Sequence, residues 1–156
     1  MAIVTDKEFS FDNFLMEYCN RAIKRRNLKW DNLWIYDGDE GSGKSTLAVA
    51  HCYYLSHLIG KKFTVDNIFF KLEDMIVILW DEAALGALGI DHMKKDQKQL
   101  VKALMVARKK RHIWIFVIPK FYELKQYIVR RSIGLIHVYA ENNMYRGRFT
   151  YYKKNA

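Results

Sequence analysis

The stretch LWIYDGDEGSGKSTLAVA, residues 33–50, decides the fold. Its first four residues, 33–36, are apolar and β-prone, which predicts a short buried strand. A glycine-rich turn follows at once. From residue 45 to residue 59 apolar side chains return at helical spacing, and Gly60 stands just after them, where helices often end. The stretch therefore predicts a strand, a tight loop and a helix in direct succession.

The loop matches the pattern G-x-x-x-x-G-K-[ST] and predicts a site for the phosphates of a nucleoside triphosphate. Its glycines let backbone N–H groups turn inward, and the following helix N-terminus favours an anion. We expect Lys44 to contact the β- and γ-phosphates, the Ser45 hydroxyl to bind Mg²⁺ and Thr46 to touch the α-phosphate. The alternative is an ordinary glycine-rich turn. The predicted nucleotide-binding residues are Gly38, Asp39, Glu40, Gly41, Ser42, Gly43, Lys44, Ser45 and Thr46.

A second motif, MIVILWDEA at residues 75–83, ends an apolar run in two acids. A carboxylate at the end of a neighbouring strand can complete the shell of Mg²⁺, and we assign this role to Asp81. Glu82 can orient and deprotonate a water for attack on the γ-phosphate, so it is, with Lys44, a predicted catalytic residue. A surface acid, solvated or salt-bridged, is the alternative for each carboxylate.

Strands that alternate with helices along the chain predict an α/β fold. We expect a mostly parallel central sheet flanked by helices, closed by a C-terminal β-hairpin. The expected single domain, residues 1–156, divides into a helical segment at 1–29, a core at 30–140 and a hairpin with a tail at 141–156. The remaining expected helices are residues 10–26, 93–111 and 121–131, and the remaining expected strands are residues 63–70, 75–80, 113–118, 135–140 and 146–152.

The chain is strongly basic, and its charge is unevenly distributed. Lys and Arg number 26 against 17 Asp and Glu, a formal net charge of +9, which favours an anionic partner. Residues 94–111 hold many of these cations and one acid, Asp96. A long polyanion, nucleic acid and DNA in particular, explains this better than a solvated helix face, which is the alternative. The candidate nucleic-acid contacts are Lys94, Lys95, Lys98, Lys102, Arg108, Lys109, Lys110 and Arg111.

Basic and aromatic residues also alternate near the C-terminus, within residues 145–154. Such alternation suits stacking on single-stranded nucleic acid. Charges that protect the edge of a sheet from pairing with another chain give the same pattern. The sequence leaves both readings open.

Several classes of site and location are not expected. Cys19 and Cys52 are too few for a disulfide framework and predict buried thiols. The five histidines show no metal-binding spacing with them. Because no apolar run approaches the roughly 20 residues of a membrane span, we expect no membrane-spanning segment. The chain is expected in the cytoplasm, or in the host cytoplasm if it is viral.

With both motifs in place, the chain resembles P-loop ATPases of the RecA-like additional-strand class. The segments LVKALMVARKKRH, IWIFVIPKFYELKQYI and RRSIGLIHVY are similar to small viral and mobile-element ATPases of the FtsK–HerA and zonular-occludens-toxin-like group. The resemblance implies a RecA-like P-loop NTPase core that couples Mg²⁺-dependent ATP hydrolysis to translocation, packaging or remodelling of DNA. It also implies a homo-oligomeric ring. Such motors commonly carry a Gln, Asn, Ser or Thr sensor after this strand, and this chain has none after residues 113–118, so Lys120 or Tyr122 would have to substitute for it.

A ring ATPase needs an arginine finger that reaches the γ-phosphate of its neighbour. Arg130 and Arg131 are the first candidates, and Arg108 and Arg111 are the second. Two other functions use the same motifs. One is an ATP-binding loader or switch that recruits a larger protein machine, and the other is a small-molecule kinase.

Overall fold

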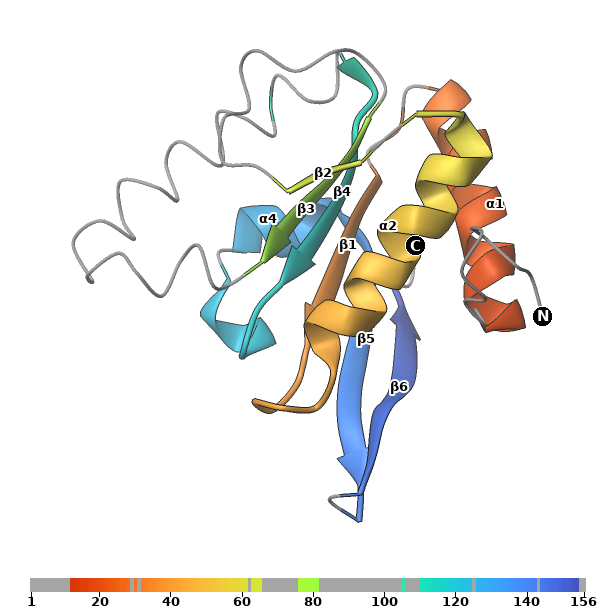
Figure 1. Cartoon of the computed structure of the whole chain (residues 1–156). Helices are drawn as coiled ribbons and strands as arrows, with labels where there is room; N and C mark the ends of the chain where they lie inside the picture. The colour runs from red at the N-terminus through yellow and green to blue at the C-terminus, as the bar shows by residue number, and fades with distance from the viewer. Residues whose placement is uncertain are drawn as a thin grey trace.

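The chain is an α/β protein with a mixed sheet flanked by helices (Figure 1). The computed structural model describes residues 12–28, 30, 32–61, 63–65, 76–81, 105, 110–124, 126–142 and 144–154. In these residues the elements are α1 (Asn13–Asn27), β1 (Asn32–Asp37), α2 (Lys44–Ile59), β2 (Thr64–Val65), β3 (Val77–Asp81), β4 (Ile113–Val117), the 3₁₀ turn η2 (Phe121–Glu123), α4 (Gln126–Arg131), β5 (Ser132–Glu141) and β6 (Tyr145–Lys153).

The described strands form one sheet in the order β2-β3-β4-β1-β5-β6. The pairings from β2 to β5 are parallel, whereas β5 and β6 are antiparallel. The expectation of a mostly parallel sheet is therefore only partly right. Consecutive strands joined by a tight turn have to run antiparallel, and this hairpin adds the most extensive pairing of the sheet. It also extends past the ends of the other strands (Figure 1).

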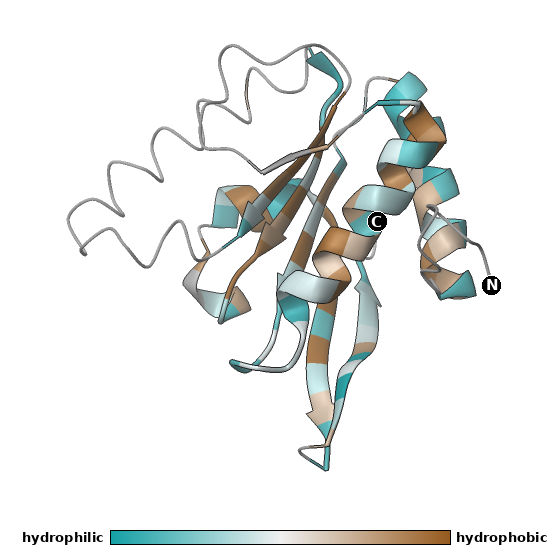
Figure 2. Cartoon of the chain, viewed as in Figure 1, coloured by the Kyte–Doolittle hydropathy of each residue, from teal (hydrophilic) through white to brown (hydrophobic). Residues whose placement is uncertain are grey.

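Each face of the sheet packs against its own helices. Trp34 and Tyr36 of β1 lie in a cluster with buried residues of α1 and α2. Trp114 of β4 lies in a second cluster with Ile128 of α4. The central strands are apolar and the projecting end of the hairpin is more hydrophilic (Figure 2). Strands buried on both faces are expected to be continuously apolar, which explains why β1 and β4 were recognisable from sequence.

Two helices differ from the expectation. Asp12 begins α1, where its side chain accepts hydrogen bonds from the N–H groups of Phe14 and Leu15 at 2.8 and 3.2 Å.

The helix expected at 121–131 is instead η2 followed by the short α4, with Leu124 in an extended conformation between them. Leu124 and Ile128 still share one apolar cluster, so their spacing predicts burial but not continuity of the helix.

Other expected elements lie largely outside the described residues. This holds for most of the helix expected at 93–111 and for residues 66–70 of the strand expected at 63–70. Of the helices that the structure describes, none has the length and apolar character needed to cross a membrane.

Candidate phosphate-binding site

The loop between β1 and α2 has a conformation that requires glycine at two positions. Gly38 has φ +137°, and a Cβ there would lie 1.9 Å from the carbonyl oxygen of Val138 in β5. Gly43 caps α2 with φ +97°, and a Cβ there would lie 3.2 Å from the backbone nitrogen of Gly147 in β6. Side chains with a Cβ rarely adopt these angles. The loop is therefore shaped by its own glycines and by the hairpin beside it.

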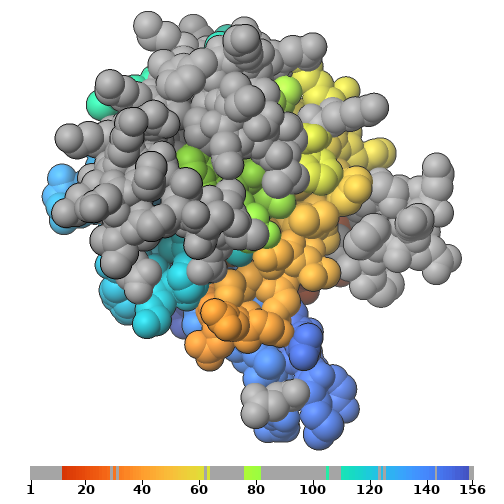
Figure 3. All heavy atoms as spheres, turned by 60° about the vertical axis from the view of Figure 1, so that its left-hand side comes forward, coloured from red at the N-terminus to blue at the C-terminus, as the bar shows by residue number. Residues whose placement is uncertain are grey.

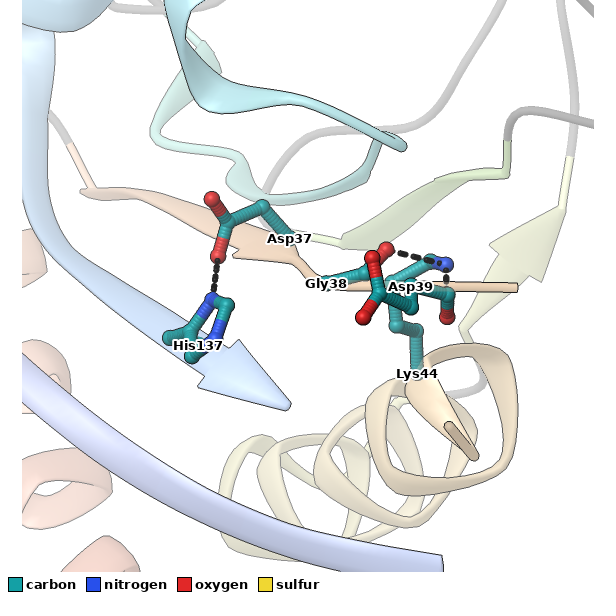
Figure 4. Close-up of polar contacts among 5 residues, drawn as sticks. All are labelled: Asp37, Gly38, Asp39, Lys44 and His137. Atoms are coloured by element: carbon teal, nitrogen blue, oxygen red, sulfur yellow. Dashed lines mark hydrogen bonds and ion pairs between the residues drawn. The ribbon is translucent and has the colours of Figure 1, made fainter. Parts of the chain in front are cut away.

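Lys44 is the first residue of α2, and its ammonium lies within the loop. The Nζ atom donates hydrogen bonds to the carbonyl oxygens of Gly38 at 2.7 Å and Asp39 at 2.8 Å (Figure 4). The residue is 8% exposed. A cation held by neutral carbonyls at the N-terminus of a helix creates a site that favours an anion. Because its partners are uncharged, Lys44 keeps its full positive charge available for a phosphate group.

The other polar residues of the loop differ in exposure. Asp39, Glu40, Ser45 and Thr46 are exposed, whereas Ser42 is buried. Exposure lets the two carboxylates remain hydrated, which reduces the repulsion that they would exert on a bound phosphate. Ser45 and Thr46 lie in the first turn of α2, the end of the helix that attracts anions.

Asp81 lies at the same edge of the sheet as the loop. It ends β3, and it pairs in register with Val117 of β4, which in turn pairs with Tyr36 of β1. Two strand spacings of about 4.8 Å put the backbones of Asp81 and Tyr36 roughly 10 Å apart. A phosphate and a metal ion bound at the loop that follows Tyr36 would have to bridge a separation of this size to reach Asp81. Both residues offer oxygen ligands, so they fit Mg²⁺ by donor type.

The structure does not describe the predicted catalytic residue Glu82 or most of the basic segment at residues 94–111. Glu82 lies outside the described residues, and so do Lys94, Lys95, Lys98, Lys102, Arg108 and Lys109. Lys110 and Arg111 are described and half-buried. They precede β4, at the edge of the sheet opposite to the loop, because β4 runs parallel to β1. Within one chain, the structure does not bring these two cations to Lys44.

The candidate arginine fingers also lie away from the loop of their own chain. Arg130 and Arg131 end α4 and precede Ser132, which pairs with the beginning of β1. The Arg131 guanidinium donates to the hydroxyl of Tyr127 at 2.9 Å and lies 5.5 Å from the centre of that ring. Either arginine could therefore reach a γ-phosphate at the Lys44 loop only in a neighbouring copy of the chain.

The structure adds a pair that sequence reasoning did not identify. Nδ1 of His137 in β5 lies 2.9 Å from a carboxylate oxygen of Asp37, the last residue of β1 (Figure 4). Asp37 directly precedes Gly38, so this pair adjoins the loop. The residues are 100 positions apart. Neither their types nor their spacing signals the contact, because it depends on β5 pairing with β1.

The C-terminal hairpin also contacts the loop directly. The backbone N–H of Gly147 donates a 2.8 Å hydrogen bond to the carbonyl of Ser42. In the space-filling view, the hairpin lies against the loop and projects from the body of the protein (Figure 3). The loop is therefore held between the end of β1, the beginning of α2 and the strand β6.

Comparisons with known proteins show the fold. No family model and no curated protein matches the sequence. C. elegans PCH-2 matches 82% of this chain at 16% identity with a TM-score of 0.53, over 43% of its own length. A chain in the E. coli MS115-1 HORMA:CdnC:Trip13 complex matches 85% of this chain at 13% identity with a TM-score of 0.55, over 58% of its own length. The chain thus spans about half the length of these structures.

These structural neighbours correct the family that the sequence suggested. They are PCH-2 and a HORMA:CdnC:Trip13 complex, and not RecA-like additional-strand ATPases of the FtsK–HerA or zonular-occludens-toxin-like group. The narrower resemblance depended on short apolar strands and one basic segment. Such patterns report burial and charge, which α/β proteins of many families share. The family assignment was therefore wrong because patterns of burial and charge do not distinguish one α/β family from another.

Proposed function

We propose that this chain binds ATP with Mg²⁺ at the loop of residues 38–46 and hydrolyses it. The observation that supports this most directly is the position of Lys44. Its ammonium lies inside a glycine-rich loop, at the N-terminus of α2, and bonds to the carbonyl oxygens of Gly38 and Asp39. Electrostatic stabilisation by such prearranged groups is the main means by which proteins accelerate phosphoryl transfer.

Each residue of the site has a distinct role in the proposed reaction. Lys44 would leave its two carbonyl partners for oxygens of the β- and γ-phosphates. Ser45 and Asp81 would hold Mg²⁺, which when bound neutralises charge on the phosphates. Glu82, which follows Asp81 directly in the sequence, would accept a proton from the attacking water.

We further propose that hydrolysis serves work on nucleic acid, DNA in particular, by a homo-oligomer. The net charge of +9 exceeds what a nucleotide alone requires and supports a longer anionic partner. The location of Arg130 and Arg131 at the far edge of the sheet supports an oligomer, because only a second copy could use their charges at the γ-phosphate.

A hydrolysis assay tests the first proposal. We expect Lys44→Ala to lower Mg²⁺-dependent ATP turnover by about 100-fold or more, the scale found when one transition-state donor is removed. Lys24→Ala is the matched control, because Lys24 is an exposed lysine of α1, away from the loop. Equal turnover in the Lys44→Ala and wild-type proteins would contradict the proposal. Circular dichroism verifies that both variants are folded.

A mixing experiment tests the oligomer. Arg130→Ala would keep an intact loop but lack the arginine, whereas Lys44→Ala would lack the loop lysine but keep the arginine. If the arginine acts on a neighbouring chain, mixing the two inactive variants restores part of the turnover. No recovery, in a mixture that associates by light scattering, would exclude Arg130 from this role. The same mixture made with Arg131→Ala tests the second candidate.

A second function is favoured by two observations. β4 is buried throughout and continues into Ile118 and Pro119, so the first polar side chain after it is that of Lys120, and no Asn, Gln, Ser or Thr stands there to sense the γ-phosphate. In addition, one structural neighbour is part of a HORMA:CdnC:Trip13 protein complex. The chain would then be an ATP-binding switch that recruits a protein partner. Tight binding of a fluorescent ATP analogue, with negligible turnover in the presence of DNA, would select this function.

A further inference from the structure

A cavity of about 630 Å³ lies beside the phosphate loop but is separate from it. Asp37, at the end of β1, adjoins both. Leu135 and His137 of β5 line the cavity, while the alternate residues Ile136 and Val138 pack in the cluster beneath α1 and α2. Because side chains alternate along a strand, the cavity opens on the opposite face of the sheet. Residues 38–46 do not line it, so the proposed ATP site does not account for the cavity.

The lining of the cavity combines cations with aromatic rings. Arg130, Lys153 and Lys154 contribute positive charge. Tyr122 and Tyr152 lie beside them and are 95% and 55% exposed. The acid that lines the cavity, Asp37, is paired with His137. The lining residues thus include three cations, one acid and two exposed rings, a combination that suits a ligand with both an aromatic base and a phosphate.

The same combination continues from the cavity along the hairpin. Tyr139 and Arg148 pair across β5 and β6, on the face that also carries Leu135 and Tyr152. At about 3.3 Å per residue, the distance from Arg148 to Lys154 is about 20 Å. Arg148 is engaged by Glu141 at 3.2 Å, but both side chains are more than half exposed, so a phosphate can compete for the arginine. This surface is long enough for several nucleotides.

We propose that the cavity and this face of the hairpin bind single-stranded nucleic acid. One base stacks on Tyr122 and another on Tyr152, and the flanking phosphates meet Arg130, Lys153 and Lys154. The length of the surface favours a strand over a free nucleotide, which has the same chemistry but occupies only the cavity. The choice of nucleic acid as the partner rests on the proposed function, whereas the location of the site rests on the residues named here.

The test measures binding of a fluorescein-labelled oligothymidylate of about 15 residues by anisotropy, without ATP. We expect Tyr122→Ala and Tyr152→Ala each to weaken binding by about tenfold, the scale of one lost stacking contact. Tyr122→Phe and Tyr152→Phe keep the ring and should bind as the wild type does. Lys154→Ala should lower the slope of log affinity against log salt concentration by about one. Thermal melts verify that each variant is folded.

Matched controls separate this site from general attraction to a basic protein. Tyr145 is 62% exposed but lies outside the cavity, near the hairpin turn, so Tyr145→Ala should bind normally. Lys24→Ala removes one charge from α1 and should also bind normally. A loss of affinity in Tyr145→Ala equal to that in Tyr122→Ala would overturn the proposed location, and so would unchanged affinity in both cavity variants.

Two further outcomes distinguish the sources of the ligand. If unlabelled thymidine monophosphate displaces the oligonucleotide at equal concentration, the cavity binds free nucleotides and the proposal of a strand is wrong. If the wild type binds no oligonucleotide, the proposed site is wrong as well. ATP turnover of the same preparation, measured without nucleic acid, then tests the proposed hydrolysis separately.

Discussion

The backbone N–H of Gly147 in β6 donates a 2.8 Å hydrogen bond to the carbonyl of Ser42 in the phosphate loop. The two residues are far apart in the sequence, and the contact leaves little room between β6 and the helix cap at Gly43. A change in the loop on binding a phosphate would therefore be transmitted to the hairpin. The same hairpin carries the proposed nucleic-acid surface on one face.

The first prediction concerns Gly147→Ala. Gly147 has φ +82°, and a Cβ there meets no atom within 4 Å, so the cost is conformational and about 1–2 kcal/mol. Gly60→Ala is the matched control, because Gly60 has φ +65°, equally open space and a position at the far end of α2. Urea melts should show similar losses of stability.

Fluorescent-nucleotide titrations then separate the two glycines. We expect Gly147→Ala alone to change nucleotide affinity, because the strained residue shifts the hydrogen bond to Ser42. Identical nucleotide affinities in the Gly147→Ala and Gly60→Ala variants would show that β6 does not influence the loop.

The second prediction concerns the metal. Asp81→Asn keeps the size of the side chain but removes its charge, so Mg²⁺-dependent ATP turnover should fall by about 100-fold. Nucleotide binding without Mg²⁺ should stay unchanged, because Lys44 and the loop are intact. Asp12→Asn is the control, since asparagine caps α1 about as well as aspartate does. A loss of metal-free binding in Asp81→Asn would instead indicate a structural role.

The third prediction concerns pH. His51 is fully buried, its Nδ1 lies 2.7 Å from the hydroxyl of Tyr36, and burial lowers its pKa to about 3. The unfolded imidazole takes up a proton below about pH 6.5, and the folded one does not until about pH 3. The contribution of neutral His51 to the free energy of unfolding is thus fully present above pH 6.5 and is lost as the pH falls from 6.5 toward 3.

Urea melts at two pH values measure this contribution. Between pH 7.5 and 5, the loss due to His51 should be about 2 kcal/mol, from about 1.4 kcal/mol for each pH unit below 6.5. His51→Asn retains an acceptor for Tyr36 and should flatten the pH dependence by that amount. His57→Asn, on the exposed side of the same helix, should not. Parallel pH profiles for wild type and His51→Asn would contradict the assignment.

The fourth prediction concerns packing beneath α1. A Cβ on Gly134 would lie 2.4 Å from the ring of Tyr151, which packs against Tyr18 and Trp34 at ring-centre distances of 4.3 and 5.8 Å. Since these two rings restrict movement of the half-buried Tyr151 ring, Gly134→Ala should cost about 1–3 kcal/mol. In a Tyr151→Leu background the same substitution should cost much less, because the smaller side chain leaves room. Equal costs in both backgrounds would mean that Tyr151 moves freely.

Much of the fold was predictable because its signals are local. β1, β3 and β4 are continuous apolar runs, and Gly60 ends α2 in the left-handed conformation that glycine favours. The family was not predictable, since apolar strands and basic segments recur in unrelated α/β proteins. The prediction of one helix at 121–131 was wrong for a related reason. The two short elements η2 and α4 bury apolar residues at the same spacing as a continuous helix would.

The sequence by itself determined the chemistry of the loop. The φ angles of the glycines and the reach of the Lys44 side chain depend on residues that are close in sequence. The segment GDEGSGKS is therefore sufficient to predict the conformation of the loop. Tertiary structure decided which distant residues join that loop. The alignment of Asp81 with Tyr36, the Asp37–His137 pair and the Gly147–Ser42 hydrogen bond all depend on which strands pair and in what register. Backbone hydrogen bonds are the same for every residue type, so the backbone of a strand does not specify its partner. The partner and the register are set by which arrangement buries the apolar side chains of the whole sheet.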